Sequence, residues 1–199
     1  MSETASPTAD APTPLSAKHL NALRAAVLGA NDGIVSIAAV LLGVIGATSD
    51  TKTLAIAAVA AMSAGAFAMA TGEYVSVSSQ RDAELVARVH ARSKGAQDDE
   101  VEAIMLTSPT HAAIASFLAF LAGGIIPTVV AFAPWGAYRG TATFVAVVLA
   151  LVVTGWLSAR AANASVRRAI VRIVVGGSLA MAITYGIGRL VGHLAGVDI

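Results

Sequence analysis

The sequence predicts an all-α integral membrane protein with five transmembrane helices. Of its 199 residues, 56% are hydrophobic and only 13% are charged, and the mean hydropathy is +0.75. A soluble domain usually has about 25% charged residues. Five apolar segments each have about the 20 residues that a helix needs to cross ~30 Å of hydrocarbon. Backbone groups in lipid must be satisfied within the segment, so these segments are expected to be helices.

From the N-terminus to the C-terminus, the sequence predicts a tail, one membrane domain and a second short tail. Residues 1–22 are rich in Ser, Thr, Ala and Pro and lack an apolar core, which predicts a disordered tail rather than a secretory signal. The membrane domain covers 23–193, and residues 194–199 form the C-terminal tail. The expected spans are 25–47, 54–79, 112–132, 141–159 and 169–191.

Short connections predict that neighbouring spans are antiparallel. "TSDTKT" joins the first two spans and "APWGAYRG" joins the third and fourth. The connection 80–111 is expected to be cytoplasmic and helical: 80–93 continues the second span, Gly95 breaks it, and "DDEVEAIML" starts another helix.

Lys and Arg residues are distributed unequally between the two ends of the five spans. Three lie at one end: Lys52, Arg139 and Arg189. The other ten are Lys18, Arg24, Arg81, Arg88, Arg92, Lys94, Arg160, Arg167, Arg168 and Arg172. The excess predicts a cytoplasmic N-terminus and a C-terminus on the far side. Arg172 and Arg189 lie near helix ends, from which they can reach the interface.

Two acidic residues fall inside the first two spans. Asp32 is the only charge in the first span and Glu73 the only charge in the second. An acidic residue at a helix centre costs about 2.5 to 3.5 kcal/mol on the translocon scale, so such residues usually face a protein interior or a water-filled path. Counted from the cytoplasmic ends, both lie roughly 10 Å deep, which predicts that the carboxylates meet around a cation. The alternatives are an Asp32 that caps a helix or hydrogen-bonds a neighbouring helix, and an interfacial Glu73.

Methionine and serine residues extend this lining along the same helical faces. Met69 precedes Glu73 by four residues and Met62 precedes Met69 by seven, while Ser76 and Ser36 fall at matching positions. Carboxylate oxygen beside thioether sulfur favours a transition metal such as Fe²⁺ over Mg²⁺ or Ca²⁺. The alternative for each methionine is ordinary packing.

Small residues predict close helix packing around the two carboxylates. The expected positions are Gly29, Gly33, Gly65 and Gly72. A symmetric dimer built on the first helix would double each of these ligands around one axis. The alternative is packing within one chain.

Four long motifs resemble the vacuolar iron transporter family: "RAAVLGANDGIVS", "AGAFAMATGEYVSVSSQRDAE", "FLAGGIIP" and "AITYGIGRLVG". The resemblance implies a homodimer of five-helix chains that moves Fe²⁺, and often Mn²⁺, out of the cytosol in exchange for protons. It also implies a path lined by Asp32, Met69 and Glu73. The connection 80–111 is short, as in the nodulin-like branch that lacks a long cytoplasmic metal-binding domain.

The expected function is therefore divalent-metal transport, with Fe²⁺ or Mn²⁺ as substrate, protons as coupling ion and no resident cofactor. The alternatives are a non-transporting membrane assembly or regulatory protein and a transporter of another solute. No enzyme motif and no nucleic-acid-binding feature is apparent. The chain is expected to lie in a lipid bilayer, which would be the plasma membrane if the source is bacterial and a vacuole-like membrane if it is eukaryotic. Four acidic residues of the connection form a weak metal-attracting patch or a solvated helix start: Asp98, Asp99, Glu100 and Glu102.

Overall fold

The computed structural model describes residues 17–98, 101, 107–161 and 164–197, and within these residues the regular structure is helical throughout. Five helices are long and apolar enough to cross a membrane, which confirms the predicted fold class. A 3₁₀ turn, η1 (Gly136–Tyr138), precedes one of them. The five are α1 (Ala17–Ala47), α2 (Thr51–Ser93), α4 (Pro109–Phe132), α5 (Arg139–Ala161) and α6 (Val166–Leu194).

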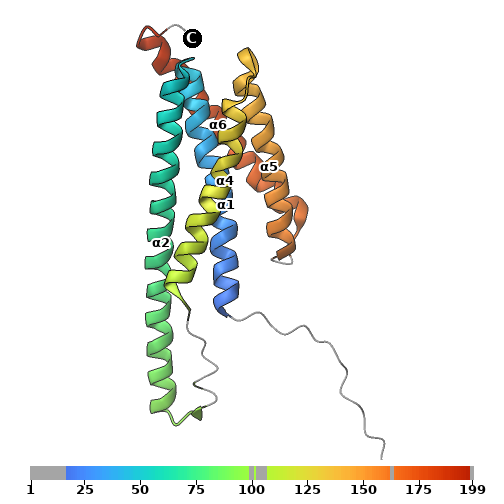
Figure 1. Cartoon of the computed structure of the whole chain (residues 1–199). Coiled ribbons are helices and arrows are strands. Elements are labelled where there is room, and N and C mark those ends of the chain that lie inside the picture. Colours follow the sequence, from blue (N-terminus) through green and yellow to red (C-terminus); the bar gives the residue numbers. More distant parts are fainter. Residues whose placement is uncertain (1–16, 99–100, 102–106, 162–163, 198–199) are drawn as a thin grey trace, which may run out of the picture.

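Helix α1 lies at the centre of the bundle and packs against each of the other four (Figure 1). The short segments 48–50 and 133–138 reverse the chain at one end, which we call the hairpin end; the C-terminal end of α6 also lies there. At the opposite end, the C-terminal part of α2 projects beyond the bundle, and we call this the extension end (Figure 1).

The boundaries of α1 and α2 differ from the expected spans because helix continues past the apolar segments. Helix α1 begins at Ala17, so residues 17–22 of the expected disordered tail are helical; "AKHLNALR" consists largely of good helix formers. Helix α2 begins at Thr51, where the carboxylate of Asp50 accepts hydrogen bonds from the first turn. It ends at Ser93, two residues before Gly95, whose φ of 81° suits a residue without a side chain. Most of the helix expected at 98–106 lies outside the described residues.

Two hydrophobic clusters lie on opposite sides of α1. One joins α1 to α2 and α4 around Ile37, Leu41 and Phe120. The other joins α1 to α5 and α6, with Leu151 and Met181 as fully buried members. Between these clusters α1 has little surface left for lipid, whereas α2 exposes large apolar side chains that suit a lipid environment.

Glycines let the backbones of α1 and its neighbours approach closely. A Cβ on Gly29 would lie 2.6 Å from the carbonyl oxygen of Ser116, and one on Gly33 would collide with the carbonyl of Phe120. On the other side of α1, a Cβ on Gly192 would lie 2.5 Å from the carbonyl oxygen of Ala47. Because the obstacles are backbone atoms, no change of rotamer can relieve them. These glycines therefore fix α1 against α4 and α6.

Candidate functional site

A groove between α1 and α2 contains the first of the two membrane-embedded acidic residues. Its volume is about 430 Å³, and Phe120 of α4 forms part of its wall. Asp32 and Ser36 face it from α1, and Met69 faces it from α2. Carboxylate oxygen and thioether sulfur, which the sequence singles out, therefore share one groove.

Asp32 is half-buried, and its carboxylate makes no hydrogen bond or ion pair with any side chain in the described part of the chain. The hydroxyl of Ser36 donates a 2.5 Å hydrogen bond to the backbone oxygen of Asp32, one turn earlier in α1. The hydroxyl of Ser36 is thus satisfied by the backbone, and the carboxylate of Asp32 remains open to the groove. Close packing of Gly29 and Gly33 on α4 sets the rotation of α1 that turns Asp32 toward α2.

Met69 and Gly65 form the α2 side of the groove. Gly65 is required there because a Cβ would collide with the ring of Phe120, which closes the groove from α4. Gly72 differs from the other three predicted packing glycines, because a Cβ at this position would meet no atom within 4 Å. Its surface is open in the single chain.

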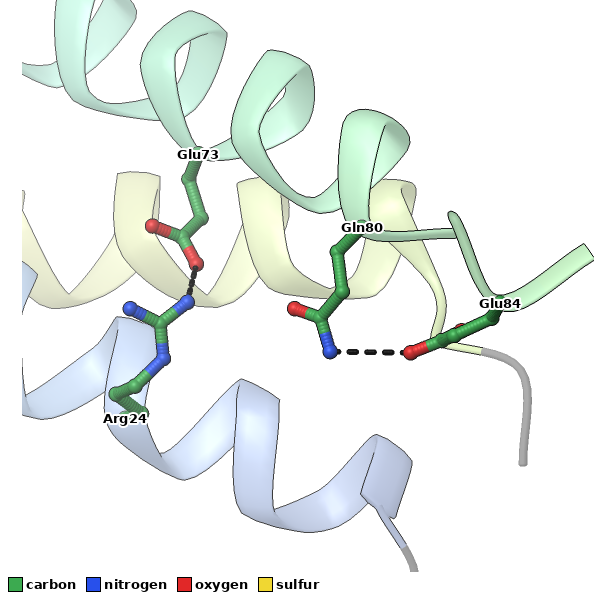
Figure 2. A network of polar contacts seen from close by, with 4 residues as sticks. All are labelled: Arg24, Glu73, Gln80 and Glu84. Atoms are coloured by element: carbon green, nitrogen blue, oxygen red, sulfur yellow. Dashed lines mark hydrogen bonds and ion pairs between the residues drawn. The ribbon is translucent and has the colours of Figure 1, made fainter. Parts of the chain in front are cut away.

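Glu73 occupies a different environment from Asp32. It is 7% exposed, and its Oε1 accepts a 2.8 Å charge-assisted hydrogen bond from Nη2 of Arg24 (Figure 2). Arg24 precedes Asp32 by eight residues on α1, a rise of about 12 Å. The sequence expectation that Asp32 and Glu73 lie level with each other therefore differs from the structure, in which Arg24 is the partner of Glu73.

Two other predicted lining residues lie apart from the groove. Met62 packs toward α4, where its sulfur is 3.6 Å from the hydroxyl oxygen of Thr128. Ser76 is exposed on α2, one turn beyond Gly72. Neither belongs to the groove that Asp32 lines.

A second polar contact ties the projecting part of α2 to the segment before α4. Glu84 accepts hydrogen bonds from Gln80 at 3.0 Å and from the backbone nitrogen of Thr107 at 2.8 Å (Figure 2 shows the first). Sequence reasoning did not identify Glu84 or the partnership of Arg24. Of the predicted acidic patch, Asp98 is exposed, whereas Asp99, Glu100 and Glu102 lie outside the described residues.

The described residues of one chain offer too few strong ligands for a complete metal site. Among the described residues, no three His, Asp or Glu side chains come together in a way that could hold a metal ion. Asp32 and Met69 provide two ligands of different softness, and Glu73 lies one helical turn from Met69. Further ligands must come from water, backbone oxygen or a second chain.

The model of the VIT family matches residues 23–107 and 84–189, which together span most of this chain. The chain belongs to the VIT family. It is 46% identical over 176 residues to vacuolar iron transporter homolog 4 of Arabidopsis thaliana, covering 88% of this chain and 86% of that protein. It is 44% identical to vacuolar iron transporter homolog 1 of Oryza sativa subsp. japonica, covering 85% of this chain and 74% of that protein. The predicted family resemblance is confirmed, and the chain is a multi-pass membrane protein.

Proposed function

We propose that the protein transports a divalent transition metal, Fe²⁺ or Mn²⁺, out of the cytosol in exchange for protons. The observation that carries this proposal is the open, half-buried carboxylate of Asp32, which lines the same groove as Met69 inside a membrane-spanning bundle. A carboxylate at that depth requires a proton or a cation as a partner. Membership of the VIT family and the names of the relatives support a metal as that cation.

Proton exchange follows from the same carboxylate. Metal and proton compete for its oxygens, so a metal that enters from one side displaces a proton, and a proton that enters from the other side releases the metal. Glu73 adds a second exchange point, at which Arg24 holds the carboxylate until the metal arrives. The metal would then move past Met69 between Glu73 and Asp32.

The direction of transport rests on the distribution of basic residues. The extension end and its connections collect ten of the thirteen Lys and Arg residues, which favours a cytosolic position for that end. Glu73 lies nearer to that end than Asp32 does, so a metal leaving the cytosol would meet Glu73 first. The relatives' names favour a vacuole-like membrane if the source is eukaryotic. In a bacterial plasma membrane the same orientation would move metal out of the cell.

A homodimer would complete the site. The side of α2 beside the groove exposes small residues four positions apart, namely Ala60, Ala64, Ala68, Gly72 and Ser76. Such spacing allows close approach of a second membrane helix. A two-fold axis along this face would bring a second Asp32, Met69 and Glu73 toward the first set and supply the ligands that one chain lacks.

Metal flux into proteoliposomes tests the proposal. Purified protein is reconstituted with and without a pH gradient, and uptake of Fe²⁺ and of Mn²⁺ is followed for wild type, Asp32→Asn and Asp50→Asn. Asp50→Asn is the matched control because asparagine also caps a helix, so the same charge is removed outside the groove. We expect gradient-stimulated flux in wild type and the control, and a loss of at least tenfold in Asp32→Asn.

Other outcomes separate the alternatives. Metal flux that is the same with and without the pH gradient would reject proton exchange but would still support metal transport. Equal flux in wild type and Asp32→Asn would remove Asp32 from the path. No flux of either metal from folded protein would favour another solute or a non-transporting assembly.

A further inference from the structure

A second pocket lies at the hairpin end, remote from the groove between α1 and α2. Its volume is about 570 Å³, and it is formed by the end of α1, the turn after it, η1, the start of α5 and the last part of α6. The lining residue of α1 that comes nearest to Asp32 in the sequence is Leu42, ten residues further on, a rise of about 15 Å along the helix. The pocket therefore belongs to neither the candidate metal path nor the small-residue face of α2.

Two guanidinium groups line this pocket, and its wall contains no acidic residue. They belong to Arg139, at the first position of α5, and to Arg189, near the end of α6. The acidic residue of the adjoining turn, Asp50, does not line the pocket, and its carboxylate accepts hydrogen bonds from the first turn of α2. The lining residues of the pocket therefore carry two positive charges and no negative charge, since arginine stays protonated in proteins.

Arg139 is not simply reaching for water. Its Nε is buried and has no hydrogen-bond partner, and its Nη2 lies 3.5 Å from the hydroxyl of Thr51, at the limit of a hydrogen bond. An arginine that only extends to the membrane interface keeps its guanidinium hydrated. A buried guanidinium N–H without a partner is costly, and an anion in the pocket would remove that cost.

Other groups around the two arginines also suit an anion. Hydroxyl-bearing residues line the same pocket, among them Thr48, Ser49 and Tyr185. Helix α5 begins there, and its first backbone N–H groups carry partial positive charge. The carbonyl end of α1 also reaches the pocket, but its partial charge of about −0.5 is smaller than the two full charges of the arginines.

Apolar side chains form the floor of the pocket. Leu42 and Met181 are buried there, beside Phe144. The pocket thus combines a cationic, hydroxyl-lined rim with an apolar base.

We propose that this pocket binds a phosphate group, either as free phosphate at the hairpin end or as the headgroup of an anionic phospholipid whose chain covers the apolar floor. Both sources offer the same chemistry: a tetrahedral anion that accepts two N–H bonds from each arginine fork. The bound phosphate would link α1, α5 and α6 at the hairpin end. This site is independent of the proposed metal transport.

Binding is measured on the full-length protein with two probes. Inorganic phosphate is titrated against protein in neutral detergent, and thermal unfolding is compared in nanodiscs of phosphatidylcholine with and without phosphatidylglycerol. The variants are Arg139→Gln, Arg189→Gln and Lys52→Gln. Lys52 is the matched control because it is a cation at the same end of the bundle that does not line the pocket.

We expect a saturable response to at least one probe, reduced at least tenfold in affinity or by more than half in thermal shift for both arginine variants. Lys52→Gln should behave as wild type. A response to phosphatidylglycerol alone identifies a lipid site, a response to inorganic phosphate alone identifies a free-anion site, and responses to both show that the phosphate group itself is recognised.

Two results overturn the proposal: no response of the wild type to either probe, or an equal loss in Lys52→Gln, which would indicate unspecific attraction. If Arg139→Gln does not fold, the exposed Arg189 still decides the question. Arg139→Lys adds a further check, since it keeps the charge but loses the Nε–H and should bind more weakly than wild type.

Discussion

The ion pair between Arg24 and Glu73 should make a measurable contribution to the free energy of unfolding. An exposed pair contributes about 0.2–1 kcal/mol, whereas breaking a buried pair costs about 3–5 kcal/mol. Here the glutamate side chain is 7% exposed and the arginine side chain 54% exposed, with 2.8 Å between Oε1 and Nη2. Solvent at the arginine screens the pair, so we expect a coupling energy of about 1–2 kcal/mol, between the exposed and buried cases.

A double-mutant cycle measures this coupling without attributing other losses to it. Arg24→Gln, Glu73→Gln and the double variant are compared with wild type by equilibrium unfolding in mixed micelles. Arg24→Gln should cost more than Glu73→Gln, because it leaves a buried carboxylate without a partner. A coupling below about 0.3 kcal/mol would show that the pair contributes nothing and would refute the reasoning.

The same variant also tests the proposed role of Glu73. If a metal must displace Arg24 from the carboxylate, Arg24→Gln removes the competitor and should tighten Mn²⁺ binding by about tenfold, since 1.4 kcal/mol corresponds to a factor of ten. Arg172→Gln serves as a control that removes a positive charge from α6 instead. Unchanged or weaker Mn²⁺ binding in Arg24→Gln would mean that Arg24 does not compete with the metal.

Three further predictions concern packing, metal selectivity and helix capping. Gly33→Ala should lower the free energy of unfolding by at least about 2 kcal/mol, because its Cβ meets a backbone carbonyl of α4, whereas Gly72→Ala should leave the monomer's stability intact; equal effects in unfolding assays would contradict this packing. Met69→Leu should weaken Mn²⁺ or Fe²⁺ flux at least threefold and Met62→Leu should not, since only the first lines the groove; equal losses would argue against a thioether ligand. Hydrogen bonds from the first turn of α2 lower the pKa of Asp50; its capping contribution is therefore fully present above about pH 4 and is lost as the pH falls through the lower folded-state pKa. At pH 7 the unfolding midpoint of Asp50→Ala should therefore be lower than that of wild type, and in acid the two midpoints should converge. A difference between the midpoints that does not change with pH would show that the charge of Asp50 does not contribute to the cap.

Composition and segment length were sufficient to predict the five-helix fold. Each span is an apolar run of membrane length, so few other arrangements satisfy the backbone in lipid. The helix ends were harder to predict. Residues 17–22 continue α1 beyond its apolar segment, and hydropathy does not detect a helix that continues into water. The continuation of α2 over 80–93, in contrast, was expected from the sequence and is present.

The prediction that Glu73 lies at the same depth as Asp32 was wrong for a related reason. Its depth was counted from the cytoplasmic ends of the spans, which hydropathy locates poorly. Counted from Asp50 in the hairpin turn, Asp32 and Met69 are 18 and 19 residues away, whereas Glu73 and Arg24 are 23 and 26 residues away. Two antiparallel helices rise equally from the turn that joins them, so residues at similar counts from Asp50 lie at similar depth. Counting from the turn therefore places Asp32 level with Met69, and Arg24 near Glu73, as in the structure. The rotation of each helix still required the glycine contacts, which the sequence does not specify.

Some charged groups of the bundle have a partner of opposite charge or a hydrogen-bond acceptor within the chain, and others do not. Glu73 has its counter-ion, Arg24, on the neighbouring helix. Asp32 faces a groove without one, and Arg139 has a buried N–H group without an acceptor. A charge that is satisfied internally can be explained by stability alone. Asp32 lies in the middle of α1 and Arg139 at the hairpin end, and the two groups have opposite signs, so one ligand is not expected to satisfy both. The two proposals made above therefore call for separate partners, a cation in the middle of the bundle and an anion at the hairpin end.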